Sequence, residues 1–424
     1  MIKILDYSAL GESIFAREET STINLEAVVR DIIQNVRDNG DKALYEYAKK
    51  FDKADLDSLI VTEKEFNQAF DQVDDEFIEI LKKASANIKE FHSNQVRQGF
   101  TITRPDGVVM GQKITPIERA GLYVPGGTAN YPSTVLMDSI PAKLAGVKEL
   151  CIATPPSADG KINPVILVAS KIAGVDKVYK IGGAGAIAAL AYGTESVKKV
   201  DKIVGPGNAF VAEAKRQVYG VVSIDMIAGP SEILIVADGK SNPKHLAADL
   251  LSQAEHDKMA SAVLVTDSNE LALAVQKEIE VQLEKLPRKE IARVSIDTNG
   301  KIIVAKDFNE VIKVSNKIAP EHLELIVDNP FEYLDKIENA GSIFMGRYCP
   351  EALGDYFAGP NHTLPTSGTA RFSSPLSVDD FIKKSQFTYY TKDALEKVYK
   401  DVATFANVEG LQAHANSATI RFEK

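Results

Sequence analysis

Apolar residues at helical spacing dominate the first hundred positions of the chain. The apolar positions of a first predicted helix recur at intervals of three and four: Leu25, Val28, Val29, Ile32, Ile33 and Val36. Gly40 follows as a stop signal. Thr62 to Glu65 has the sequence of a capping box and predicts the start of a short helix. From about Asp74 to Arg97 the pattern predicts a long amphipathic helix.

From about residue 120 onward, short β-branched apolar runs alternate with helical segments. The predicted strands are Glu149–Ala153, Val165–Ala169, Lys177–Ile181, Lys202–Val204, Glu232–Ala237, Ala262–Thr266, Ile302–Ala305, Leu323–Val327 and Ile343–Met345. Such alternation predicts βαβ units and mostly parallel sheets, and the number of runs indicates more than one sheet. The chain turns helical again from about Val378 to Val408 and ends in a short extended tail.

Composition narrows the class of protein. A length of 424 residues suggests two or three domains, and 45% hydrophobic with 25% charged residues is ordinary for a globular protein. The net charge of −10 argues against nucleic acid as a main partner. The N-terminus reaches Asp6 too soon for a signal peptide, and no apolar stretch approaches membrane-spanning length. Cys151 and Cys349, the only cysteines, fit a reducing cytoplasm.

Three glycine-rich turns point to a phosphate-bearing cofactor. They are Gly121–Thr128, Gly182–Ala188 and Gly205–Asn208. The second contains Gly183-x-Gly185-x-x-Ala188, which fits the dinucleotide fingerprint, and Asp201 lies at about the right distance for a ribose contact. The alternative is that these glycines only allow close packing of helix on strand. A Walker motif is absent, which disfavours a nucleotide triphosphatase.

The sequence places several of its six histidines beside possible metal ligands or proton carriers. A helix that starts at Pro243 would carry Gln253 and His256 on one face, a pair that suits Zn²⁺. Asp355 and His414 could complete a set of four ligands. A solvated helix end is the alternative interpretation of the isolated pair.

An acid–base pair is the third candidate for chemistry. Glu321 and His322 follow Pro320 and precede an apolar run, so His322 could act as general base while Glu321 holds a water. A surface carboxylate beside a packing imidazole is the alternative. His92 and His245 have no matching partner and are interpreted as structural.

Taken together, these segments resemble the histidinol dehydrogenase family over nearly the whole chain. The most specific runs are Gly121–Thr128, Gly205–Phe210, Ala228–Glu232, Asp249–Asp257, Ala319–Glu324 and Glu351–Phe372. The resemblance implies an enzyme that oxidises L-histidinol to L-histidine with two NAD⁺, through an aldehyde-level intermediate. It also implies a cytoplasmic homodimer with one zinc ion per active site.

The resemblance also implies roles for individual residues. The zinc ligands would be Gln253, His256, Asp355 and His414, with His414 supplied by the partner subunit. His322 would be the base and Glu321 would activate water. The residues in contact with L-histidinol would be the four zinc ligands, His322, Ser231, His362 and Glu409, of which Glu409, like His414, reaches the partner's site. Tyr123 and Asn208 would contact NAD. Gly185 stands where the family has a glutamine that touches the cofactor, so this contact departs from the pattern.

The predicted fold is α/β, with two incomplete dinucleotide-fold domains, an N-terminal arm and a helical C-terminal part. The predicted boundaries are residues 1–19 for the arm, 20–123 with 233–376 for the first α/β domain, 124–232 for the NAD-side domain and 377–424 for the C-terminal arm. Two other functions fit parts of the pattern. A zinc hydrolase would use the same ligands on an amide or ester, and a non-catalytic binding protein would keep the fold alone.

Overall fold

The computed structural model describes residues 1–9, 23–126 and 131–423, and these form two compact units. The first unit comprises Met1–Gln95 and Ile117–Phe381, and the second comprises Val96–Pro116 and Ile382–Lys424. The mixed α/β fold with mostly parallel sheets that the sequence predicts is confirmed. Among the described helices, none combines the length and the apolar character needed to cross a membrane.

The first unit contains a six-stranded, fully parallel sheet in the order β1-β11-β10-β9-β12-β13. Its strands are β1 (Lys3–Asp6), β9 (Glu232–Ala237), β10 (Ser261–Thr266), β11 (Lys301–Val304), β12 (His322–Ile326) and β13 (Ser342–Met345). Every residue of β9 and β12 is buried. A strand covered on both faces tends to be a continuous apolar run, as β9 is after Glu232, whereas β12 also buries the polar residues His322 and Glu324.

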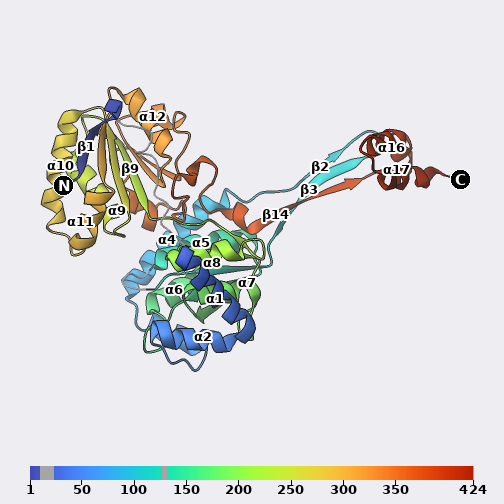
Figure 1. Ribbon diagram of the computed structural model, residues 1–424, viewed down its shortest axis with the longest axis horizontal. Coiled ribbons are helices and arrows are strands. Elements are labelled where there is room, and N and C mark those ends of the chain that lie inside the picture. Colours follow the sequence, from blue (N-terminus) through green and yellow to red (C-terminus); the bar gives the residue numbers. More distant parts are fainter. Residues whose placement is uncertain (10–22, 127–130, 424) are drawn as a thin grey trace. The chain divides into compact units, whose positions relative to one another are not determined.

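Helices cover both faces of this sheet (Figure 1). One face packs against α9 (Pro243–Ala254), α10 (Asn269–Leu283) and α11 (Lys289–Thr298). The other face packs against α12 (Phe308–Ile318) and the short α13 (Phe331–Leu334). The predicted helix start at Pro243 is confirmed, because the Asn242 side chain accepts a hydrogen bond from Lys244 N and caps α9.

A second parallel sheet has the order β6-β5-β4-β7-β8. Its strands are β4 (Arg119–Tyr123), β5 (Glu149–Thr154), β6 (Lys177–Lys180), β7 (Lys202–Val204) and β8 (Ser223–Ile224). Along the chain, the strands first run outward from β4 to β6 and then return to the other side of β4. This reversal between β4 and β7 opens a crevice at their carboxyl ends, where parallel sheets bind ligands.

The two faces of this second sheet have separate cores. One core involves α3 (Glu63–Phe70), α4 (Asp75–Ser93), α5 (Pro132–Ala145) and α6 (Pro164–Ala173). The other involves α1 (Ile23–Asn39), α2 (Asp41–Tyr47), α7 (Gly183–Tyr192) and α8 (Ala209–Val218). The sequence prediction groups residues 20–123 with residues 233–376. In the structure, α1 and α2 pack against α7, and α1 also packs against α8. Both of these contacted helices lie within residues 124–232, the predicted NAD-side domain.

The second unit is a three-stranded antiparallel sheet followed by helices. It contains β2 (Phe100–Thr103), β3 (Val109–Pro116) and β14 (Ile382–Tyr389), in the order β14-β3-β2. It continues with α15 (Lys392–Glu396), α16 (Tyr399–Val408) and α17 (Gln412–Thr419). The last two helices share a small core of Ala403, Ala406 and Ala415.

The remaining helical elements are short. They are η1 (Tyr7–Ala9), η3 (Ala48–Asp52, a π-helix), α14 (Glu351–Tyr356), η4 (Thr369–Arg371), η5 (Val378–Phe381) and η6 (Ile420–Phe422). Of the predicted N-terminal arm, residues 10–19 lie outside the described residues, and β1 belongs to the six-stranded sheet through its pairing with β11.

Three predictions of local structure are wrong. The end of the chain is not an extended tail, because Gln412–Thr419 forms α17 and Ile420–Phe422 forms η6. Val165–Ala169 is not a strand but lies in the first half of α6, which Asn163 caps and Gly174 ends. Residues 378–408 are not continuously helical, because Ile382–Tyr389 forms β14 and pairs with β3 over eight residues. A short apolar run does not distinguish a strand from a buried helix, and β14 depends on a partner strand more than 260 positions away. The capping box at Thr62 and Glu65 is confirmed.

Candidate functional site

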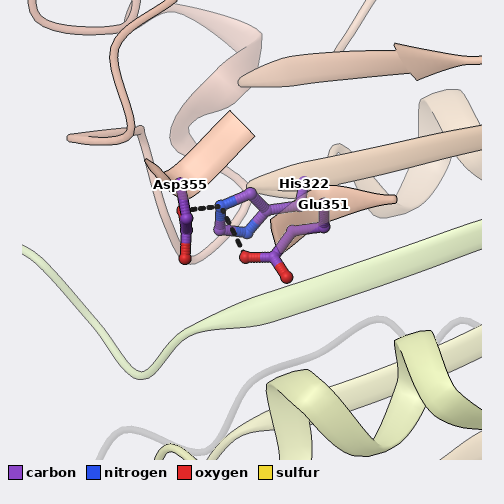
Figure 2. Close-up of side chains that lie close together, drawn as sticks. All are labelled: His322, Glu351 and Asp355. Carbon is purple, nitrogen blue, oxygen red and sulfur yellow. Dashed lines mark ion pairs between the residues drawn. The ribbon is translucent and has the colours of Figure 1, made fainter. Parts of the chain in front are cut away.

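His322, the first residue of β12, lies at the centre of a cluster of polar side chains. Its Nδ1 lies 2.9 Å from the backbone oxygen of Glu232. A carbonyl oxygen only accepts, so Nδ1 carries the proton of the neutral ring and Nε2 has a free lone pair. Nε2 lies 3.8 Å from Oε1 of Glu351 and 4.0 Å from Oδ1 of Asp355 (Figure 2). The ring is thus oriented as a proton acceptor.

The short helix α14 supplies both carboxylates. Glu351 and Asp355 are four residues apart, which places them on the same face of a helix. Glu324 of β12 accepts a hydrogen bond of 2.7 Å from Glu351 N at the start of α14. The three side chains His322, Glu351 and Asp355 offer ligand atoms within 4.8 Å of one another, the arrangement of a metal-binding cluster.

Burial controls the electrostatics of this cluster. Desolvation raises the pKa of Glu351 to about 7 and that of Asp355 to about 6. Desolvation also lowers the pKa of His322 and that of His362 to about 4. Burial therefore shifts each group toward its neutral form, and a positive charge placed among them would favour the ionised state of both carboxylates.

Gln253, in the last turn of α9, is buried with a relative exposure of 0%. Neither its amide nitrogen nor its amide oxygen has a hydrogen-bond partner among the described residues. An unsatisfied buried amide costs on the order of 1–3 kcal/mol, so its oxygen is available for a ligand. His256 follows one turn later and influences the pKa of His322, His362 and Glu351. The donor set suits a borderline cation such as Zn²⁺.

The remaining predicted residues of the first unit surround this cluster. Glu321 Oε2 accepts a hydrogen bond of 2.8 Å from Glu232 N and lies 3.5 Å from His322 Nδ1. Nδ1 of His362 is 3.1 Å from the backbone oxygen of Asp355, and its Nε2 is 3.2 Å from Thr134 Oγ1 on α5. His322, Asp355 and His362 line a small cavity of about 110 Å³. Ser231 directly precedes β9.

Two predicted residues belong to the second unit. Glu409 is the C-cap of α16, and His414 lies on α17. Both side chains are exposed. The cluster around His322 is built by the first unit alone, and a second chain is the proposed source of these two residues.

Sequence reasoning missed Glu351. Its distance of four positions from Asp355, in a segment bounded by Pro350, was the available signal. Gln253 and His256 are close together in the sequence and therefore predict a metal site on their own. Glu351 has no histidine near it in the sequence, and only the fold brings His322 of β12 close to its carboxylate.

A cavity of about 1030 Å³ lies at the carboxyl ends of the second sheet. Tyr123, Asn208 and Gly182–Gly185 line it, so the three predicted cofactor residues face one space. The Tyr123 hydroxyl accepts a hydrogen bond of 3.0 Å from Gly183 N. Asn208 caps α8, with Oδ1 accepting from the backbone nitrogens of Phe210 and Val211. The fingerprint glycines begin α7 directly after β6, as predicted.

The ring of Tyr47 packs against Gly185, in the space that a side chain at position 185 would need. A Cβ atom at this position would lie 3.0 Å from Cδ2 of Tyr47 and 3.7 Å from Cδ2 of Leu44. Tyr47 itself accepts a hydrogen bond from Asn35. Any longer side chain at 185 therefore requires Tyr47 to move by a few tenths of an ångström.

The predicted ribose contact at Asp201 is wrong. The carboxylate of Asp201 accepts hydrogen bonds from the backbone nitrogens of Glu118 and Arg119, at 2.9 and 3.0 Å. It lies at the amino ends of β4 and β7, whereas the large cavity lies at their carboxyl ends. The correct distance along the sequence does not bring this residue to the ligand side of the sheet.

Comparisons with known proteins agree with one another. A sequence model of histidinol dehydrogenase matches residues 15–422. Histidinol dehydrogenase from Clostridium acetobutylicum is 56% identical over 424 residues, which cover 99% of this chain and 98% of the relative. That from Streptococcus mutans is 55% identical over 95% of this chain and 94% of the relative. The crystal structure of histidinol dehydrogenase from Elizabethkingia anophelis superimposes with a TM-score of 0.95 at 40% identity, over 99% of this chain and 98% of that one.

Proposed function

The chain belongs to the histidinol dehydrogenase family of oxidoreductases in histidine biosynthesis, and we propose that it oxidises L-histidinol to L-histidine with two NAD⁺ and one zinc ion per site. One observation carries the zinc-dependent part of this proposal. The unpartnered amide of Gln253 is buried, and His256, from the same segment, acts electrostatically on the His322 and Glu351 cluster. The proposed compartment is the cytoplasm, where Cys151 and Cys349 stay reduced.

The residues that would hold zinc are Gln253, His256 and Asp355, with His414 of the partner subunit as the fourth ligand. When bound, zinc supplies Lewis-acid polarisation and orientation of the substrate amino alcohol, and no redox chemistry. Glu351 hydrogen-bonds Asp355 and so orients it. The substrate would lie among these ligands, Ser231, His362 and Glu409 of the partner subunit. The dimer follows from the need for these two partner residues.

His322 would accept the proton of the substrate alcohol at Nε2 while a hydride passes to NAD⁺. The hydrogen bond from Nδ1 to the Glu232 oxygen keeps the required tautomer. At the second oxidation, His322 would accept the proton of the hydrated aldehyde in the same way. Glu321, held by Glu232 N, would deprotonate the water that adds to the aldehyde carbon. The first oxidation then yields one NADH and one proton. The second yields one NADH and two protons, because the carboxylic acid product ionises at neutral pH.

The large cavity supports the assignment of NAD. Its residues include the amino end of α7, where backbone N–H groups favour a pyrophosphate. Tyr123 and Asn208 would contact the cofactor, with Gly185 beside them. A zinc hydrolase would need the metal cluster but would leave this cavity of about 1030 Å³ without a function.

The proposed reaction is tested by measuring NADH and histidine together, starting from L-histidinol and NAD⁺. We expect two NADH per histidine, complete loss of turnover after chelation and recovery when zinc is returned. Protein incubated without chelator for the same time is the control. Absence of NADH formation while zinc is still bound would contradict the dehydrogenase proposal, and unchanged turnover without metal would contradict the role of zinc.

Zinc affinity should decrease as the pH falls from 7 to 5. The pKa of Asp355 is about 6 and that of Glu351 about 7, so both hold protons in this range that zinc must displace. With ordinary carboxyl pKa values, near 4, the two carboxyls would be ionised above pH 5 and would add nothing to the competition that any histidine ligand makes. Calorimetric titration with zinc, in two buffers of different ionisation enthalpy, counts the released protons. Glu351→Gln should remove the part of the dependence near pH 7, and a pH-independent affinity would refute the explanation.

A further inference from the structure

Asp52 is the one acidic residue among the described residues that line the large cavity. It ends η3, and the following residue, Lys53, adopts a left-handed backbone with φ of 61°. Its half-buried carboxylate forms no hydrogen bond or ion pair with any described residue. A carboxylate that is partly removed from water without a hydrogen-bond or ion-pair partner is unfavourable, so we expect a ligand to bind it.

Burial has a measurable effect on this carboxylate. Desolvation raises the pKa of Asp52 to about 6. The other charged residue of the cavity lining, Lys50, is exposed and its Nζ lies 5.1 Å from the centre of the Phe51 ring. The carboxylate is therefore left to interact with hydroxyl or N–H donors of whatever fills the cavity.

We propose that Asp52 accepts hydrogen bonds from the two hydroxyls of the adenosine ribose of NAD⁺ and thereby excludes NADP⁺. This inference rests on the proposed use of NAD. A carboxylate matches the two donors of a ribose diol, whereas the 2′-phosphate of NADP⁺ would bring a second negative charge against it. Asp52 thus takes the role that spacing alone assigned to Asp201.

The two faces of the second sheet indicate which ribose is involved. The acid–base cluster contacts α5 through His362 and Thr134, so the reacting nicotinamide end belongs on the α5 side. Asp52 is carried by the segment after α2, on the opposite face. Leu44 and Tyr47 of α2, just before that segment, lie over Gly185 in the first turn of α7. A dinucleotide with its pyrophosphate at α7 would direct its adenosine half toward Asp52.

The test compares NAD⁺ and NADP⁺ as substrates for the zinc-loaded wild-type enzyme and for Asp52→Asn. We expect KM for NAD⁺ to rise about tenfold to a hundredfold, the size of one lost charge-assisted hydrogen bond, with the loss falling on KM rather than on kcat. The preference for NAD⁺ over NADP⁺ should fall at least about tenfold. Asp55→Asn is the matched control, because Asp55 carries the same charge three positions later with a 90% exposed side chain.

Each outcome decides a different part of the inference. Equal kinetics for Asp52→Asn and Asp55→Asn would overturn it. Weaker binding of nicotinamide mononucleotide with an unchanged coenzyme preference would also overturn it, since Asp52 would then contact the other ribose. Asp52→Ala provides a second variant if the asparagine form is unstable. Absence of NADH formation by the wild-type enzyme would instead be a failure of the proposed function.

Discussion

Replacing His322 with alanine is expected to lower kcat by about 10²-fold or more, the usual loss when an acid–base group is removed. The imidazole Nε2 is the free proton acceptor of the cluster, and the ring is held by the Glu232 carbonyl. The measurement is NADH formation at saturating L-histidinol and NAD⁺, with zinc content determined in parallel. Zinc content should stay unchanged, because His322 is not one of the proposed ligands, and a loss of zinc would instead show that the cluster of His322, Glu351 and Asp355 holds the metal. A variant with wild-type turnover would favour a non-catalytic role for this site.

The same variant tests the proposed origin of His414. His322→Ala and His414→Ala chains are each expected to be inactive as pure dimers. A mixed dimer contains one site with an intact His322 and a His414 from the other chain. Mixing under conditions that exchange subunits should therefore restore about half of the activity per mixed dimer. Mixed dimers as inactive as both parents would contradict a ligand that crosses the interface.

Replacing Lys215 with methionine is expected to destabilise the protein by roughly 3–5 kcal/mol, the cost of leaving one partner of a buried ion pair without the other. Lys215 and Asp225 form an ion pair, and their side chains are only 2% and 1% exposed. Lys215 Nζ also donates to the oxygen of Gly205 at 3.0 Å, and Asp225 accepts from Gly205 N at 2.8 Å. The pair therefore holds the turn that leads to Asn208. Chemical denaturation measures the change in the free energy of unfolding.

A matched control is available on the same half of the protein. Lys143 and Asp176 form a pair of 2.7 Å with side-chain exposures of 29% and 41%. Lys143→Met should cost at most about 1 kcal/mol, as for other solvent-screened pairs. The double variant Lys215→Met with Asp225→Leu should be more stable than Lys215→Met alone, because no buried charge is left unpaired. Equal losses for the two single lysine variants would refute the explanation.

Local sequence patterns predict the elements that are buried on both faces or clearly capped. The apolar runs of β9 and β10 have no alternation because both sides are covered, so they stand out in the sequence. The strand β12 is equally buried, but its sequence alternates polar and apolar residues at His322 and Glu324. The start of α9 is also local, since Asn242 and Pro243 need no distant partner. The strand β14 has seven exposed or half-exposed polar or aromatic positions in a row after Ile382, and only its pairing with β3 makes it a strand.

In the candidate site, too, some residues are recognisable from local sequence and others only from contacts between distant segments. Gln253 and His256 are recognisable because an amide and an imidazole lie three positions apart at a predicted helix end, although α9 ends at Ala254 and His256 lies just beyond it. Glu351 is not recognisable, because its importance comes from His322, which a different strand brings to within 3.8 Å. The fingerprint at Gly183 correctly predicts a turn between strand and helix. It does not say which acid meets the ribose, since spacing from the glycines cannot distinguish the two ends of a strand.

By itself, the sequence determined the α/β class, the family, the capping box that starts α3, the start of α9, and the residue types available for metal and proton chemistry. These properties depend on interactions within a few positions of the chain, or on motifs long enough to be specific. Only the tertiary structure decided that β12 and α14 bring His322, Glu351 and Asp355 together, and that Gln253 of α9 is buried without a partner among the described residues. It also placed Asp201 at the amino end of its sheet and Asp52 in the cavity. Burial and distance between segments far apart in sequence depend on packing, and packing is not encoded in any local spacing.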